Sequence, residues 1–275
     1  MNVLLLLLAM VALLYLFISL LLYRMQEKMI FFPEPLPPDY NFRAITGEDF
    51  EELWLPRPDG KVHGLYFPCA NRRGVILYFH GNGGAMPDWV DVAPRFLQRG
   101  YDVLIMDYRG YGKSQGNLSQ AALLGDADAA CVYLMQQFDP SEIVVYGRSL
   151  GSGFAAYVAA RHQPQKVLLE TPYYSIARVA ARRFPLLPVR RLIRYPMPSA
   201  TFLEKVLCPV WLVHGTRDTV ISHKNSRDLQ AKIGPERCIY TEIPGGTHND
   251  LDTYDAYWKW LDAALNAPAI NPHTI

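Results

Sequence analysis

The 275-residue chain has no excess of charge of either sign, since 27 Lys and Arg side chains stand against 26 Asp and Glu. Nucleic-acid-binding proteins usually carry a basic excess, so this balance argues against a nucleic-acid partner. A composition that is 50% hydrophobic also excludes a disordered or collagen-like chain. The length fits one large α/β domain, or at most two small ones, with enough chain to bury a core.

Cysteine is scarce, and the usual patterns of metal or cofactor binding are missing. The four cysteines lie far apart and form no C-x-x-C pair, so neither a metal site nor a disulfide framework is indicated. The run Gly112-Lys113-Ser114 matches the end of a phosphate-binding loop, but Asp107 stands where that pattern requires glycine. We therefore expect no metal and no cofactor.

The first 23 residues contain no charged side chain, and only Ser19 interrupts the apolar run over residues 3–22. At about 1.5 Å per residue this run is roughly 30 Å long, the thickness of a bilayer hydrocarbon core. A cleaved signal peptide would have a basic start, a shorter apolar stretch and small residues at its cleavage site. Residues 1–23 are therefore expected to form an uncleaved transmembrane anchor. A signal peptide is one alternative, and a buried globular helix is another.

Basic residues follow the apolar run, because Arg24 and Lys28 come after it and only the α-amine precedes it. The positive-inside rule then favours a single-pass membrane protein whose main domain faces the cytoplasm. Unpaired cysteines are compatible with such a reducing compartment. Residues 24–47 contain four prolines between positions 33 and 38 and are expected to form a stiff, extended connector.

From residue 48 to 265, short β-rich runs alternate with helical stretches. This alternation predicts a mostly parallel sheet covered by helices, in which ligands bind beyond the carboxyl ends of the strands. Strands are expected over residues 50–55, 62–67, 75–79, 103–106, 143–146, 166–169, 210–213 and 237–243. Helices are expected near residues 87–99, 119–137, 150–162, 222–233 and 249–265, and a tail over 266–275.

A Gly-x-Ser-x-Gly pattern, from Gly147 to Gly151, follows one expected strand and opens a helix. This strand–turn–helix setting is the one that a nucleophile elbow requires. Side chains two positions from a serine in so tight a turn would clash with the strand and the helix, which explains both glycines. Ser149 is therefore the candidate nucleophile. The alternative is a glycine-rich turn without chemistry.

A serine nucleophile needs a base, and the base needs an acid that orients it. Asp218 and His248 fall in the loops that follow the last two expected strands. The resulting chain order, Ser149 then Asp218 then His248, is one of the three orders known for such triads. The rival candidates are Asp250 and Asp252 for the acid and, for the base, His214, which we expect to be buried and structural.

The glycine-rich run over residues 80–84 directly follows the expected strand 75–79. Acyl transfer needs two fixed N–H donors aimed at the carbonyl oxygen, one after the nucleophile and one from such a loop. The candidate oxyanion hole therefore consists of the backbone N–H groups of Leu150 and Asn82. A flexible glycine turn is the alternative.

Four motifs in order resemble the α/β-hydrolase superfamily, and the resemblance covers residues 26 to 265. They are HGNGG at 80–84, DYRGYGKS at 107–114, GRSLG at 147–151 and HGTRD at 214–218. The apolar leader followed by QEKMIFFP resembles a branch of single-pass, membrane-anchored serine hydrolases. That branch is similar to acyl-protein thioesterases and to prolyl-oligopeptidase-like peptidases. The resemblance implies an α/β-hydrolase fold and hydrolysis at a Ser–His–Asp triad, without identifying the substrate.

Acidic side chains are absent from residues 171–203, which carry six arginines. This segment lies in residues 172–205, where α/β-hydrolases differ most and often carry a lid. A solvated helical surface is one interpretation. The other is a lid that faces anionic headgroups or an acidic acyl substrate, because Phe184, Leu186 and Leu187 interleave with the arginines as in an interfacial segment. The arginines are Arg178, Arg182, Arg183, Arg190, Arg191 and Arg194.

These patterns predict a membrane-anchored serine hydrolase that cleaves ester or thioester bonds of acyl or lipid substrates through an acyl-enzyme. Ester and thioester substrates are favoured because the anchor concentrates the enzyme at lipid. Membrane lipid would contact the N-terminal helix and the arginine-rich insert. The alternatives are a serine peptidase or aminopeptidase of the same fold and a catalytically silent membrane scaffold.

Overall fold

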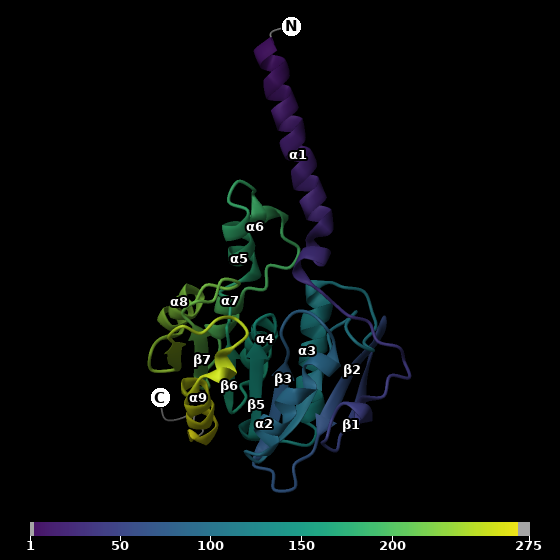
Figure 1. Ribbon diagram of the computed structural model, residues 1–275, viewed down its shortest axis with the longest axis vertical. Helices are drawn as coiled ribbons and strands as arrows, with labels where there is room; N and C mark the ends of the chain where they lie inside the picture. The colour runs from purple at the N-terminus through teal and green to yellow at the C-terminus, as the bar shows by residue number, and fades with distance from the viewer. Residues whose placement is uncertain (1–2, 269–275) are drawn as a thin grey trace.

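An eight-stranded sheet forms the centre of the molecule. A computed structural model describes residues 3–268. The strand order is β1-β2-β4-β3-β5-β6-β7-β8 (Figure 1). The pairs β1/β2 and β2/β4 are antiparallel, and the five other neighbouring pairs are parallel. The prediction of a mostly parallel sheet is confirmed. The strands are β1 (Glu51–Arg57), β2 (Gly60–Phe67), β3 (Gly74–Phe79), β4 (Tyr101–Met106), β5 (Ile143–Arg148), β6 (Lys166–Glu170), β7 (Val210–Gly215) and β8 (Cys238–Ile243).

Helices cover both faces of the sheet, so its central strands are buried on both sides. In β3, Val75 and Leu77 belong to one hydrophobic cluster, and Ile76 and Tyr78 belong to the other. This alternation has the two-residue period of a strand, and two buried faces explain why β3 is apolar throughout. Helices α3, α4, α7 and α8 pack on the first face, and α2 and α9 on the second (Figure 1).

The helices of the body differ most from expectation where proline interrupts them. The helix expected over residues 87–99 is wrong in extent: two 3₁₀ turns, Met86–Asp88 and Val90–Val92, precede a short α2. Pro87 and Pro94 explain the break, because proline is tolerated only in the first turn of a helix. The helices are α1 (Val3–Ile30), α2 (Ala93–Leu97), α3 (Gln120–Leu134), α4 (Gly151–His162), α5 (Ile176–Arg183), α6 (Val189–Leu192), α7 (Ser199–Leu203), α8 (Lys224–Ile233) and α9 (Asp255–Asn266).

Helices α3, α4 and α8 agree with the expected ranges to within three residues. The helix expected over residues 249–265 begins only at Asp255, and a separate 3₁₀ turn, Leu251–Thr253, precedes it. Of the expected tail, residues 269–275 lie outside the described residues. The arginine-rich insert folds as three short helices, α5, α6 and α7. We call the two helices α5 and α6 with their connecting loop, residues 176–192, the hairpin.

Helix α1 projects from the body, and the hairpin lies beside its lower part (Figure 1). Helix α1 has 28 residues, and Ser19 is its single buried residue. By length and composition it can cross a membrane. The helix continues to Ile30, seven residues beyond the expected anchor. The extended connector therefore begins at Phe31.

Two isolated backbone bridges attach the connector, which follows α1, to the loops of the body. Pro33 pairs with Gly84, and Pro35 pairs with Gly112, each as an isolated parallel bridge. Gly84 belongs to the glycine-rich run after β3, which holds one of the predicted oxyanion donors. The connector therefore links the base of α1 directly to the loops at the carboxyl ends of the strands.

Candidate active site

Ser149 occupies a strained turn between β5 and α4. Its φ angle is +51°, a conformation that side-chain-bearing residues rarely adopt. A Cβ on Gly147 would lie 2.6 Å from the carbonyl oxygen of Gly151, and a Cβ on Gly151 would lie 2.0 Å from that of Phe79. Both distances are too short for real contacts. The turn therefore requires both glycines of the pattern.

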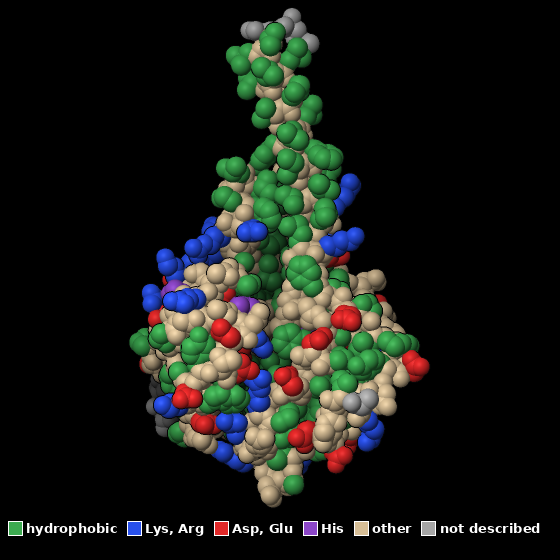
Figure 2. Space-filling view, viewed as in Figure 1, with side chains coloured by type: hydrophobic (Ala, Val, Ile, Leu, Met, Phe, Trp, Pro, Cys, Tyr) green, Lys and Arg blue, Asp and Glu red, His purple; other side chains and the backbone are tan. Residues whose placement is uncertain are grey.

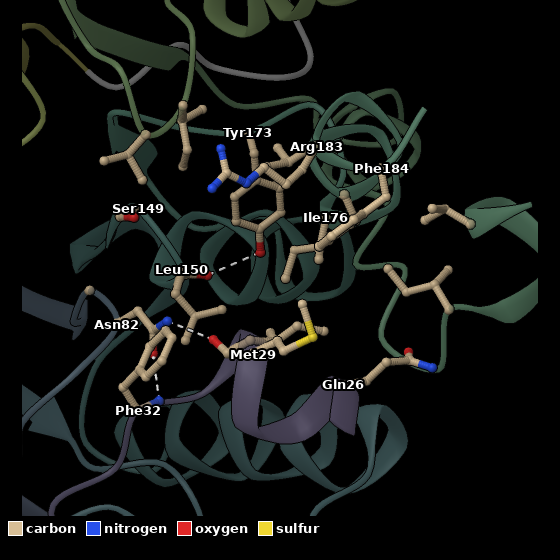
Figure 3. A pocket seen from close by; sticks show the side chains of 18 of the residues that line it. Gln26, Met29, Phe32, Asn82, Ser149, Leu150, Tyr173, Ile176, Arg183 and Phe184 are labelled. Atoms are coloured by element: carbon tan, nitrogen blue, oxygen red, sulfur yellow. Dashed lines mark hydrogen bonds between the residues drawn. The ribbon is translucent and has the colours of Figure 1, made fainter. Parts of the chain in front are cut away.

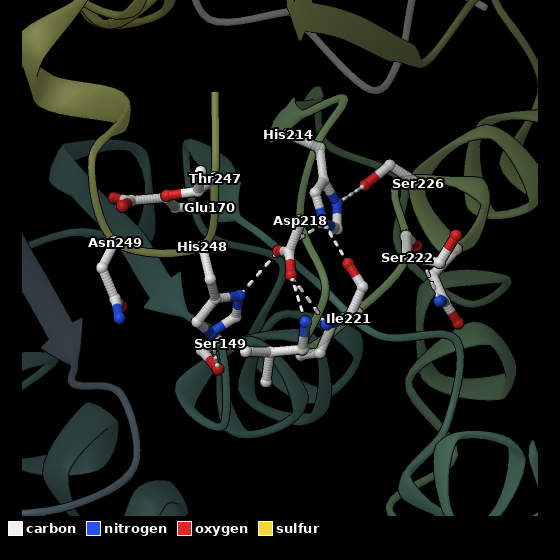
Figure 4. A network of polar contacts seen from close by, with 12 residues as sticks. Ser149, Glu170, His214, Asp218, Ile221, Ser222, Ser226, Thr247, His248 and Asn249 are labelled. Carbon is white, nitrogen blue, oxygen red and sulfur yellow. Dashed lines mark hydrogen bonds and ion pairs between the residues drawn. The ribbon is translucent and has the colours of Figure 1, made fainter. Parts of the chain in front are cut away.

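His248 lies between Ser149 and Asp218 (Figure 4). Its Nε2 atom is 2.9 Å from the Ser149 Oγ, and its Nδ1 atom is 2.6 Å from the Asp218 Oδ2. The serine follows β5, the aspartate follows β7 and the histidine follows β8. The carboxyl ends of these parallel strands meet at one edge of the sheet, so three loops far apart in sequence converge there.

Asp218 is buried and receives several hydrogen bonds. Its Oδ1 accepts the backbone N–H groups of Val220 and Ile221, each at 2.8 Å. Burial alone would raise the pKa of the carboxyl group. Hydrogen bonds from His214 and His248, the charge of His248 and the Ile221 N–H outweigh burial and hold the pKa well below its usual 3.8. Asp218 is therefore an ionised carboxylate at neutral pH.

The ionised carboxylate fixes the tautomer of His248. A carboxylate can only accept hydrogen bonds, so Nδ1 of His248 must donate its proton to Asp218. In the neutral ring, Nε2 is then the acceptor and faces the hydroxyl of Ser149. This is the tautomer that a general base needs in order to take the proton of the serine.

His214 is buried, as expected, and also contacts the acid. Its Nε2 is 2.8 Å from the Ile221 carbonyl oxygen and 3.0 Å from the Asp218 Oδ2. A carbonyl only accepts, so this Nε2 carries the proton, and Nδ1 accepts from the Ser226 hydroxyl at 2.7 Å. The sequence indicated a structural residue here, but it gave no sign of the hydrogen bond to Asp218.

The two rival carboxylates have other partners. Asp250 accepts the backbone N–H of Thr247 at 2.6 Å, and Asp252 forms an ion pair with Arg95 at 2.8 Å. The structure therefore brings Asp218, and not these two residues, to the ring of His248.

The two predicted oxyanion donors are not used elsewhere. Within residues 3–268, neither the Leu150 N–H nor the Asn82 N–H donates a hydrogen bond. The Asn82 side chain has a role that the sequence did not suggest. Its Nδ2 donates to the Ile30 carbonyl at 2.6 Å (Figure 3). Its Oδ1 accepts from the Tyr111 hydroxyl at 2.6 Å. This amide ties the end of α1 to the candidate oxyanion loop.

A partly buried ion pair lies beside the turn that holds Ser149. Arg148 Nε lies 3.2 Å from Glu170 Oε1, and its guanidinium lies 5.3 Å from the ring centre of Trp89. Glu170 Oε2 also accepts the Tyr146 hydroxyl at 2.5 Å. Sequence reasoning missed this cluster. Its one signal was a basic residue in the variable position before the candidate nucleophile.

A cavity of about 570 Å³ opens onto Ser149, His248 and Asn82. It extends between α1 and the hairpin and is lined mainly by apolar side chains (Figure 3). Among residues 3–268, no three His, Cys, Asp or Glu side chains gather closely enough to hold a metal ion.

Comparisons with known proteins agree on one family. The family model described as the alpha/beta hydrolase fold matches residues 74–168. An uncharacterized protein of Mycobacterium tuberculosis is 32% identical, covering 90% of this chain and 89% of its own. The alpha/beta hydrolase domain-containing protein WAV2 of Arabidopsis thaliana is 30% identical, covering 87% of each chain.

Solved structures show the same fold. An esterase of Pyrococcus furiosus superposes with a TM-score of 0.65 at 16% sequence identity, over 86% of this chain and 96% of its own. The fold that the motifs predicted is thereby confirmed. With relatives of this similarity over most of its length, the chain belongs to the alpha/beta hydrolase family.

Proposed function

We propose that this hydrolase is membrane-anchored and cleaves carboxylic ester or thioester bonds of acyl substrates, using Ser149, His248 and Asp218 as its catalytic triad. The observation that carries the proposal is the position of His248, with one ring nitrogen on the serine hydroxyl and the other on an ionised carboxylate. An ionised Asp218 accepts a hydrogen bond from Nδ1, which leaves Nε2 to act as the base toward the serine hydroxyl.

In the first half of the reaction, the Ser149 Oγ attacks the acyl carbonyl carbon while His248 Nε2 accepts the hydroxyl proton. The imidazolium that forms is stabilised by Asp218. The N–H groups of Leu150 and Asn82 donate to the oxyanion, and one such donor is worth roughly a hundredfold to a thousandfold in rate. The bond to the leaving oxygen or sulfur breaks, and the leaving group takes the proton from His248.

In the second half, water replaces the leaving group. It attacks the acyl-serine carbonyl and gives a proton to His248 Nε2. The acyl–Oγ bond breaks, and Oγ recovers its proton from His248. The products are a carboxylic acid and an alcohol or thiol, and the enzyme returns to its starting state. No oxidant, reductant or cofactor takes part in this sequence.

An apolar cavity beside Ser149 supports an acyl substrate rather than a charged one. The structural neighbour from Pyrococcus furiosus is itself an esterase. We therefore favour ester and thioester bonds over peptide bonds as the substrate. A peptidase would use the same triad, so substrate assays must separate the two.

We also propose that residues 1–23 anchor the protein and that residues 48–265 form the hydrolase domain, with residues 172–205 as its lid. Exposed basic side chains gather where the apolar neck meets the body (Figure 2). This pattern supports a cytoplasmic domain by the positive-inside rule. The basic band consists of Arg24, Lys28, Arg182, Arg183, Arg190, Arg191 and Arg194.

Labelling with a fluorophosphonate probe tests the nucleophile. The full-length protein in detergent should be labelled, and Ser149→Ala and His248→Ala should lose labelling while remaining folded by circular dichroism. Ser152→Ala is the matched control, because that hydroxyl is buried and donates to the Ser149 carbonyl at 2.6 Å. Labelling that persists in Ser149→Ala, or is absent from the folded wild type, refutes the proposed nucleophile.

A substrate panel then tests the bond type. p-Nitrophenyl esters, acyl thioesters and aminoacyl anilides should be offered to the same preparation. We expect turnover of the esters and thioesters to exceed that of the anilides. Faster turnover of the anilides would make the protein a peptidase, and labelling without turnover of any class would contradict the substrate assignment.

A further inference from the structure

One wall of the cavity comes from helix α1. Six residues of α1 line the cavity, at relative spacings of 0, 3, 4, 7, 10 and 11. This is the repeat of one face of an α-helix. The residues are Ser19, Leu22, Tyr23, Gln26, Met29 and Ile30.

This face gives the cavity its length. Eleven residues separate Ser19 from Ile30, which corresponds to about 16 Å along the helix axis. An extended hydrocarbon chain with C–C bonds of about 1.5 Å advances roughly 1.3 Å per carbon, so about twelve carbons fit alongside this face. The end near Ile30 reaches Asn82 and the Ser149 turn, and the end near Ser19 lies within the apolar run over residues 3–22.

Apolar side chains of the hairpin form the opposite wall. Ile176 and Phe184 lie across the cavity from Met29 and Gln26 (Figure 3). At the tip of the hairpin, Leu186 is 86% exposed. An apolar side chain so exposed beside an apolar helix is expected to lie in lipid, because water would disfavour both surfaces.

Polar contacts hold the hairpin against α1 at two places along the cavity. At the far end, the Tyr15 hydroxyl donates to the Leu186 carbonyl at 3.1 Å. Nearer the active site, Gln26 Nε2 donates to the Leu192 carbonyl at 2.8 Å, and Gln26 Oε1 accepts the Arg194 N–H at 2.8 Å. The cavity lies between these contacts and continues past Gln26 to Met29 and Ile30.

Ser19 lies between the two sets of contacts and is 9% exposed. Its hydroxyl is buried without a hydrogen-bond partner among the described residues. A small side chain at this point lets the hairpin approach α1 closely and leaves room at the far end of the cavity. A large side chain there would shorten the cavity from the membrane side.

We propose that α1 is part of the substrate-binding site as well as the anchor, and that its inner face binds a single acyl chain of about twelve carbons or more. The chain would pass from the bilayer between α1 and the hairpin and place its carbonyl at Ser149. This inference rests on the proposed hydrolase function. It adds that chain-length preference is set by residues of the transmembrane helix.

A chain-length series tests the proposal in the full-length protein in detergent. Ser19→Trp should lower kcat/KM for the sixteen-carbon p-nitrophenyl ester at least about tenfold, because several methylene groups lose their apolar contacts. It should leave the four-carbon ester unchanged. Met29→Trp, at the near end, should also impair the eight-carbon ester.

Leu20→Trp is the matched control, because Leu20 is exposed and does not line the cavity. It should preserve the wild-type profile. If Ser19→Trp and Leu20→Trp give the same profile as the wild type, α1 does not bind the acyl chain. If the wild type does not hydrolyse even the four-carbon ester, the proposed hydrolase function is refuted instead. The two failures are therefore distinguishable.

Bilayer acyl chains are found both in glycerolipid esters and on acylated cysteines. Vesicles that contain either a monoacylglycerol or an S-palmitoyl peptide distinguish these sources. Whichever substrate is cleaved, Ser19→Trp should slow it and Leu20→Trp should not. Equal cleavage by both variants at the wild-type rate would overturn the proposal for the membrane-embedded substrate.

Discussion

The side-chain amide of Asn82 donates a 2.6 Å hydrogen bond to the carbonyl oxygen of Ile30, the last residue of α1. The same side chain accepts hydrogen bonds from the Tyr111 hydroxyl and the Phe32 N–H. One residue thus joins the end of the apolar helix to the loop that carries a proposed oxyanion donor. The position of α1 and the geometry of the active site are therefore coupled.

Asn82→Ala should remove the link between the end of α1 and the loop that carries the proposed oxyanion donor. The substitution keeps the backbone N–H but leaves the Ile30 carbonyl and the Tyr111 hydroxyl without this partner, at a cost of about 1–3 kcal/mol. We expect kcat to fall about tenfold for short and long esters alike. Tyr111→Phe removes one of the same bonds and should have a smaller effect. Wild-type kcat in Asn82→Ala would show that the side chain does not position the loop.

The glycines of the serine turn give a prediction about stability. Gly151→Ala places a Cβ 2.0 Å from the carbonyl oxygen of Phe79, a backbone atom that cannot move freely. We expect a loss of about 2 kcal/mol or more in the free energy of unfolding, together with loss of activity.

Gly125→Ala in α3 is the control for that prediction. The new Cβ would meet only the end of the Arg57 side chain, at 3.2 Å, and alanine favours a helix by up to about 1 kcal/mol. Its stability should equal or exceed that of the wild type. Thermal unfolding in detergent compares the variants, and equal stability of Gly151→Ala and the wild type would contradict the steric argument.

Much of this site follows from local patterns, because each residue of the triad lies in the turn or loop that follows a strand. The turn at Ser149 could be predicted from two glycines, and the loops of Asp218 and His248 from the strands before them. Contacts between distant segments could not be predicted in this way. The Tyr15–Leu186 and Asn82–Ile30 bonds join residues 171 and 52 positions apart, and no local periodicity indicates such pairs.

The helix predicted over residues 87–99 is too long because the prediction takes no account of the two prolines within it. The cavity was missed for another reason. The leader was interpreted as an anchor alone, and nothing in its nearly uniform apolar composition distinguishes the face that lines the cavity. That face becomes defined only when the hairpin packs beside it.

The lowered pKa of Asp218 predicts how its contribution to stability depends on pH. A carboxyl whose pKa is lower in the folded state stabilises the protein above its unfolded pKa, near 3.8, and loses that contribution as pH falls toward the folded value. Asp218→Asn should therefore be less stable than the wild type at pH 7, and the difference should shrink below about pH 4.

Chemical unfolding at pH 7, 5 and 3 measures this difference. Asp39→Asn, at an exposed turn, is the control and should show little difference at any pH. A difference between Asp218→Asn and the wild type that grows as the pH falls would have the wrong sign. At pH 7, kcat of Asp218→Asn should fall by roughly a thousandfold or more, because His248 loses the acceptor that fixes its tautomer.

The exposed arginines of the hairpin predict a dependence on anionic lipid. Arg190 and Arg191 lie beside the apolar tip, and each basic residue near an anionic surface contributes about 1 kcal/mol. Arg190→Gln/Arg191→Gln should therefore weaken the stimulation of long-chain ester hydrolysis by phosphatidylserine vesicles about tenfold or more. Stimulation should also decrease with salt.

Arg161→Gln, on α4, serves as the matched control for charge. This arginine pairs with Asp128 at 2.7 Å on the domain surface. Its loss should leave the lipid stimulation unchanged. If the double variant responds to anionic vesicles as the wild type does, the hairpin arginines do not face the membrane headgroups.

Identification of the acyl-enzyme tests the nucleophile and the acyl-binding face of α1 in one measurement. The full-length protein, incubated with a sixteen-carbon p-nitrophenyl ester and quenched in acid, should carry the acyl group on the peptide that contains Ser149, as detected by mass spectrometry. Ser149→Ala should carry none, and Ser19→Trp should accumulate it more slowly than Leu20→Trp. An acyl group attached to another residue, or ester turnover that persists in Ser149→Ala, would refute Ser149 as the nucleophile.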